Sequence, residues 1–251
     1  MKTWGMIIAF LMLAVIGLAV APSSTLADTD TVETGRLLAI LLDSGRVTVG
    51  SVQALINDPE KGEKGFTPEA FETQLFHQFK ERTGIDLANL KNEKVPLHAR
   101  QLLPLLVEAS KKVVTTYQPI LNKQGLGFKN FIPATFGTQV AALFTAKSGT
   151  YIKQTAPSSI LRNAKNAPDE FEAAMLQKFA DPAYPRQGEK IASATVEGGK
   201  AVRVVLPLFY GKNCLSCHGD PKGERDISGY LREGGKAGDL GGAISVRVQA
   251  H

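Results

Sequence analysis

Two cysteines and a histidine near the C-terminal end have the residue types and the spacing for covalent cofactor chemistry. Cys214 and Cys217 are the only cysteines among the 251 residues, and His218 directly follows the second. A Cys-x-x-Cys-His run is typical of c-type haem attachment. Each thiol would add to one vinyl group of the porphyrin, and the histidine beneath the ring would donate a nitrogen to the iron. We therefore predict one covalent haem c, held by Cys214 and Cys217, with His218 as the proximal ligand.

The same residues allow other interpretations. A Cys-x-x-Cys pair in an exported protein could be a redox-active dithiol or a structural disulfide, and Cys/His clusters can bind zinc. A dithiol oxidoreductase would place the pair after an early strand, whereas here it comes late in the chain. A closed zinc site needs four ligands, and His77, His98 and His251 show no ligand-pair spacing. A thiol or disulfide protein without haem stays open as an alternative.

The N-terminal segment predicts export. Lys2 gives a positive start, residues 4–21 form an unbroken apolar run, and Thr25-Leu26-Ala27 offers small residues at a signal-peptidase site. We predict a signal peptide over residues 1–27, and retention of the segment as a membrane anchor stays open because the run approaches the length of a bilayer span. Export suits the haem interpretation, since c-type attachment takes place outside the cytoplasm. The predicted location is periplasmic or secreted.

The composition of the rest of the chain is that of a globular protein. The formal charge of +5 is modest for this length, and no basic run with interleaved aromatic residues appears, so nucleic acid is not an expected partner. The length suits one large domain, which we place at residues 28–251.

The first half of this domain predicts helices. Residues 31–57 carry apolar side chains at helical spacing, with Gly45 and Gly50 as weak points. We interpret this apolar stripe as part of the core rather than as a dimer interface. A homodimer remains an alternative. Thr67-Pro68 predicts the start of the next helix. A third helix is predicted over residues 97–122, where Pro104 and Pro119 should kink or break it.

A fourth helix is predicted over residues 131–147, with its inward face formed by Phe136, Val140, Leu143 and Phe144. The pattern then changes to strands at 151–154, 191–196, 201–208 and 242–248, with a helix starting at 166–171. Glu197-Gly198-Gly199-Lys200 is typical of a hairpin turn. No internal repeat is expected. The predicted class is α+β, with residues 28–148 mainly helical and residues 149–251 forming a small antiparallel sheet and the haem loop.

Several stretches resemble one known family. They are residues 56–67, residues 161–172, residues 213–219 around the cysteines, and residues 238–246. The chain resembles the exported c-type haem domains with a PAS-like sheet, found as stand-alone proteins in cyanobacteria and other bacteria and as periplasmic sensor domains of signalling kinases. The resemblance implies a haem on Cys214 and Cys217, His218 on the iron, and a haem loop between two C-terminal strands.

The resemblance also raises the question of the distal iron ligand. Some relatives use a cysteine thiolate there, but both cysteines of this chain would be consumed by the porphyrin. The corresponding region, near residues 131–134, has no side chain that binds iron. The distal position is therefore open or filled by water, His98 or Met175. The spacing of Met175 with Phe171 and Phe179 favours a core role for that methionine.

The resemblance favours redox or gas sensing, with NO or CO as the small ligand. The alternative is an electron-transfer cytochrome c that meets a redox partner protein. An enzyme is not expected, because no distal acid-base set is visible.

Overall fold

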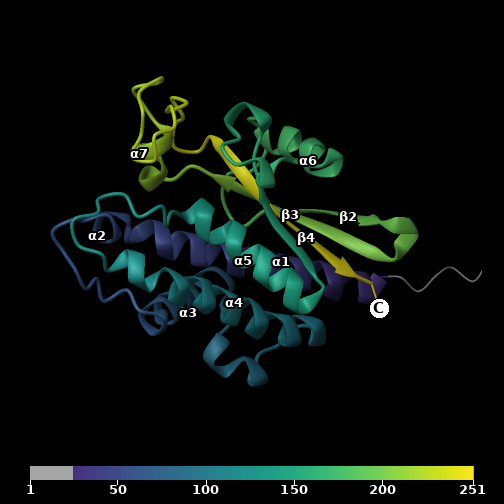
Figure 1. Cartoon of the computed structure of the whole chain (residues 1–251). Coiled ribbons are helices and arrows are strands. Elements are labelled where there is room, and N and C mark those ends of the chain that lie inside the picture. Colours follow the sequence, from purple (N-terminus) through teal and green to yellow (C-terminus); the bar gives the residue numbers. More distant parts are fainter. Residues whose placement is uncertain (1–24, 251) are drawn as a thin grey trace, which may run out of the picture.

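The computed structural model describes residues 25–250, shown in Figure 1. The predicted signal peptide falls almost wholly outside these residues. No helix in the described range is long and apolar enough to cross a membrane. The first half contains the helices α1 (Thr25–Ser51), α2 (Gln53–Ile56), α3 (Pro68–Thr83), α4 (Leu97–Leu121) and α5 (Pro133–Ser148). The second half contains β1 (Tyr151–Thr155), α6 (Glu170–Ala180), β2 (Ala192–Val196), β3 (Ala201–Phe209), α7 (Leu215–His218) and β4 (Leu240–Gln249).

The four strands form one antiparallel sheet in the order β1-β4-β3-β2. The register pairs Val204 of β3 with Val246 of β4. Alternate strand residues point to opposite faces, so Val204 and Val246 face α1, beside which α5 packs on β1, whereas Val205 and Ala243 face α6. Figure 1 shows the sheet between these two helical layers. The predicted α+β class is confirmed.

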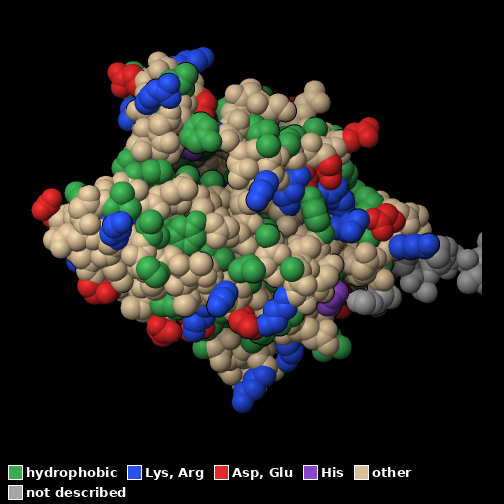
Figure 2. All heavy atoms as spheres, viewed as in Figure 1, with side chains coloured by type: hydrophobic (Ala, Val, Ile, Leu, Met, Phe, Trp, Pro, Cys, Tyr) green, Lys and Arg blue, Asp and Glu red, His purple; other side chains and the backbone are tan. Residues whose placement is uncertain are grey.

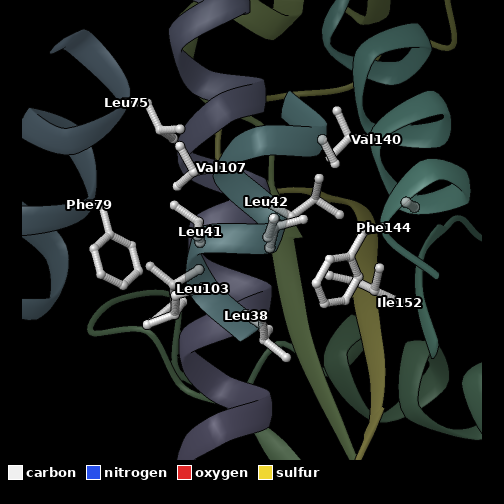
Figure 3. Packing of buried hydrophobic residues seen from close by; sticks show 14 of the residues in the cluster. Leu38, Leu41, Leu42, Leu75, Phe79, Leu103, Val107, Val140, Phe144 and Ile152 are labelled. Atoms are coloured by element: carbon white, nitrogen blue, oxygen red, sulfur yellow. The ribbon is translucent and has the colours of Figure 1, made fainter. Parts of the chain in front are cut away.

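Helix α1 is the central element of the core. Figure 3 shows Leu41 directed toward Phe79 and Leu103, and Leu42 directed toward the α5 side. A Cβ atom at Gly35 would lie 2.7 Å from Cγ2 of Val204. Glycine at this position therefore lets the helix approach β3 more closely than any other residue would.

Three local predictions differ from the structure. The first helix ends at Ser51, one residue after Gly50, and α2 follows as a separate turn. Of the predicted kink or break at Pro104 and Pro119, the break does not occur: α4 is one helix, because its buried stripe against neighbouring helices offsets the cost of proline. Leu143 is 43% exposed, since the inward face of α5 follows Phe136, Val140 and Phe144 at four-residue steps.

A short internal repeat, missed in the sequence, joins two loops before α3 and α5. We call residues 57–66 and 122–131 the paired loops. Asn57 Oδ1 accepts a hydrogen bond from Lys129 N, and Asn122 Oδ1 accepts one from Lys64 N, both at 3.0 Å. Each lysine Nζ donates to carbonyl oxygens three and six residues earlier in its own loop. The two lysines are 3% and 1% exposed, and each ammonium therefore satisfies buried carbonyl groups.

Both loops follow one sequence pattern, offset by 65 positions: Asn57, Lys64, Phe66, Pro68 and Asn122, Lys129, Phe131, Pro133. The residue after each lysine has a positive φ, 66° at Gly65 and 54° at Asn130. Glycine and asparagine are the residues that adopt this conformation most readily. Phe66 and Phe131 are buried, so each loop is anchored to the core before its helix begins.

Candidate functional site

The predicted attachment motif lies at one end of the sheet, on a lobe formed by residues 211–238. Tyr210 N donates to Asp239 O and Gly238 N donates to Tyr210 O, both at 2.8 Å, so these bonds close the base of the lobe. Figure 1 shows the lobe, with α7, standing away from the strands. Figure 2 shows the surface hollowed between this lobe and the helical body, with hydrophobic side chains at the edges of the hollow.

Both cysteines lie on one short helical segment. A 3-10 turn (Lys212–Cys214) leads directly into α7, and Cys214 N donates to Gly211 O while Gly219 N donates to Leu215 O. Residues three and four positions apart lie on the same side of a helix. Cys214, Cys217 and His218 therefore share one side of this segment. The thiols are free and half-buried. Burial raises the pKa of Cys217, so its resting form at neutral pH is the thiol.

His218 is held in place through one of its two ring nitrogens. Its Nδ1 atom lies 3.1 Å from Tyr210 Oη and 3.0 Å from Glu233 Oε2. The imidazole also stacks on the Tyr210 ring, with centroids 4.8 Å apart and planes at 23°. Burial lowers the pKa of His218, which favours the neutral imidazole that can bind a metal. The hydrogen bonds that the described residues make to the ring involve Nδ1, which leaves Nε2 for coordination.

Arg162 ties the segment before α6 to the lobe. Its guanidinium donates to Glu233 Oε1 at 3.0 Å and to Asp226 Oδ2 at 2.6 Å. Its Nη2 atom also donates to Cys217 O at 2.9 Å, and its carbonyl accepts a bond from Tyr230 Oη at 3.0 Å. One side chain thus contacts the attachment turn and the acid that holds His218.

Asp226 fixes the fold of the lobe itself. Its carboxylate is buried and accepts bonds from Ser228 N, Ser228 Oγ and Tyr230 N, besides the ion pair with Arg162. Burial alone would raise the pKa of Asp226, but the bonds from Ser228 and Arg162 outweigh it and lower this pKa. The aspartate therefore stays ionised and pairs with the guanidinium.

The residues considered as distal ligands lie on other elements. His98 is at the start of α4, which packs on α1, α3 and α5, and Figure 1 shows α4 on the other side of α1 from α7. Met175 lies on α6 and packs against the cluster that includes Phe179 and Val205. Phe131 is fully buried and packs on Tyr117 and Phe136.

Sequence reasoning missed three residues of this site: Arg162, Tyr210 and Glu233. Arg162 lies in a stretch that carried the family resemblance, but nothing in its neighbours indicated a role. Tyr210 lies two residues after the predicted strand 201–208, and nothing else in the sequence distinguishes it. Glu233 stands in a loop rich in glycine and charge, where no pattern separates it from the other acids. For zinc, the described residues offer no group of three or more His, Cys, Asp or Glu side chains arranged as a site.

The fold and the site define an α+β domain that presents two thiols and an imidazole on one turn. A family model for Tll0287-like proteins matches residues 92–249, and the chain belongs to this family. A solved structure described as the cyanobacterial haem protein Tll0287 aligns at 18% identity and a TM-score of 0.41. That alignment covers 60% of this chain and 96% of the other. No curated protein sequence matches the chain.

Proposed function

We propose that the chain is an exported mono-haem c-type protein that senses redox state or a small gas such as NO or CO. The single observation that carries the proposal is the turn that presents two free thiols beside an imidazole held through Nδ1. Family membership supports it, since the solved Tll0287 is described as a haem protein.

The donor set fits a haem. Cys214 and Cys217 would form the two thioether bonds, and His218 would coordinate the iron through Nε2. When bound, the haem supplies a one-electron couple and an iron position that can take a ligand. The protein's own part is to hold the imidazole: Tyr210 fixes the plane of the ring by stacking, and Glu233 accepts the Nδ1 proton in a hydrogen bond.

An electron-transfer cytochrome is the second candidate. The observation in its favour is the exposure of Gly211, Lys212, Asn213 and Ser216, which surround the cysteines on the outside of the lobe. A haem attached to such a turn could present an edge to a redox partner protein.

The absorption spectrum of the reduced protein with and without CO separates the two candidates. The sensing proposal requires an open or weakly held distal position, because a gas must reach the iron. We therefore expect rapid CO binding with a clear shift of the Soret band. A six-coordinate spectrum that CO leaves unchanged would contradict sensing of a gas and favour the electron carrier. A His98→Ala variant provides the matched control, since it should bind CO as the unmodified protein does.

A further inference from the structure

The strongest unexplained feature of the site is the shared carboxylate of Glu233. One oxygen, Oε2, lies 3.0 Å from His218 Nδ1, and the other, Oε1, accepts a bond from Arg162 Nε at 3.0 Å. The side chains of His218 and Glu233 are 27% and 19% exposed. Partial burial limits screening by water, so charge at Glu233 acts on the imidazole more strongly than a surface charge would.

One short segment of the lobe, residues 233–235, contacts both the ring and the backbone carbonyl of His218. Glu233 contacts the ring, and Gly235 N donates to the His218 carbonyl at 2.7 Å. A Cβ atom at Gly235 would lie 2.8 Å from the Tyr210 ring, so this segment packs directly against the tyrosine that stacks on the histidine. The position of the carboxylate is therefore fixed relative to the imidazole plane.

We propose that Glu233 is a positioning residue that lowers the reduction potential of the iron through His218, and that Arg162 moderates this effect. The inference rests on the proposed function, because it requires iron on Nε2. With iron there, Nδ1 carries the proton and donates it in a hydrogen bond to the carboxylate, which makes the imidazole a stronger electron donor. A stronger donor stabilises ferric iron relative to ferrous iron.

Arg162 also contacts the Glu233 carboxylate, and its positive charge should raise the reduction potential that the carboxylate lowers. Its guanidinium neutralises part of the charge on Glu233 and so weakens the pull of the acid on the Nδ1 proton. Tyr210 Oη is a second, uncharged acceptor near Nδ1 at 3.1 Å, so it orients the ring without adding a full charge. The balance between Glu233 and Arg162 then sets how electron-rich the ligand is.

The test is the reduction potential of the full, haem-loaded chain, measured by spectroelectrochemical titration. Glu233→Gln keeps the shape of the side chain and removes its charge, and we expect its potential to shift upward. Glu224→Gln is the matched control, because it removes the same charge from an exposed position of the same lobe and should shift the potential much less. Arg162→Gln should shift the potential downward, with the opposite sign.

The outcomes separate this inference from the function on which it rests. An upward shift in Glu233→Gln, together with a much smaller change in Glu224→Gln, supports the inference. Equal shifts in the two variants, or no shift in Glu233→Gln, would overturn it and leave covalent haem in place. If Glu233→Gln fails to mature, an Arg162→Gln potential at or above that of the unmodified chain overturns it. Absence of haem from the unmodified chain would instead overturn the proposed function.

Discussion

The proposed chemistry of the site depends on three side chains, Cys214, Cys217 and His218, and on particular atoms of each. In the proposed function the two cysteine sulfurs would bond to the haem and His218 would coordinate the iron through Nε2, while the contacts to Nδ1 orient the ring. These roles use different atoms on different side chains. The imidazole and the thiols can therefore be tested independently.

Changing His218→Ala should leave the haem covalently attached and alter its spectrum. The two thiols remain, so haem staining after denaturing electrophoresis should persist, while the loss of an axial nitrogen should shift the Soret and visible bands. His77→Ala is the control, because His77 lies exposed on α3 and should leave the spectrum unchanged. A His218→Ala spectrum identical to that of the unmodified protein would remove this residue as a ligand.

At the scale of residues, the sequence predicts only the parts of the site that are close together in the chain. Cys214, Cys217 and His218 form a local pattern with a chemical reason for each position. Glu233 reaches His218 across 15 positions, and Arg162 reaches Cys217 across 55. Such contacts depend on how the lobe closes, which no local spacing encodes.

The paired loops make the clearest prediction at the scale of elements. Replacing Asn57→Ala or Asn122→Ala removes one acceptor from a hydrogen bond between the loops, and each change should lower the free energy of unfolding by about 1 kcal/mol. Because both bonds join the same two loops, the double variant should deviate from additivity. Urea denaturation measures all three variants.

An exposed asparagine provides the control for this series. Asn92 makes a local hydrogen bond to Asn89, three positions earlier in the chain. Asn92→Ala should therefore change the free energy of unfolding by no more than about 0.5 kcal/mol. If Asn57→Ala and Asn122→Ala are as mild as Asn92→Ala, the reciprocal bonds do not stabilise the fold.

Local signals explain which elements were predicted correctly. Thr67 caps α3 through a bond from Ala70 N, and Pro68 occupies the first helical position, as this sequence pattern predicts. The hairpin between β2 and β3 also follows from its turn residues. The path of α4 through Pro104 could not be predicted, since it depends on tertiary packing that overrides propensity.

At the scale of the whole molecule, α1 links the two halves of the fold. It packs on α3, α4 and α5 and also on β3 and β4. The sequence predicts the α+β class because the hydrophobic period changes after Gly149. It does not predict that α6 takes the opposite sheet face from α1, since either face would satisfy the same alternating pattern in the strands. The lobe then extends from the end of this sheet, between β3 and β4.

Covalent attachment of haem can be tested by the intact mass of the chain after expression in a host that attaches c-type haem. Covalent attachment predicts a mass increased by one haem for the unmodified protein, and no covalent haem in a Cys214→Ser, Cys217→Ser double variant. A colourless unmodified protein, with its thiols free or joined to each other, would contradict it.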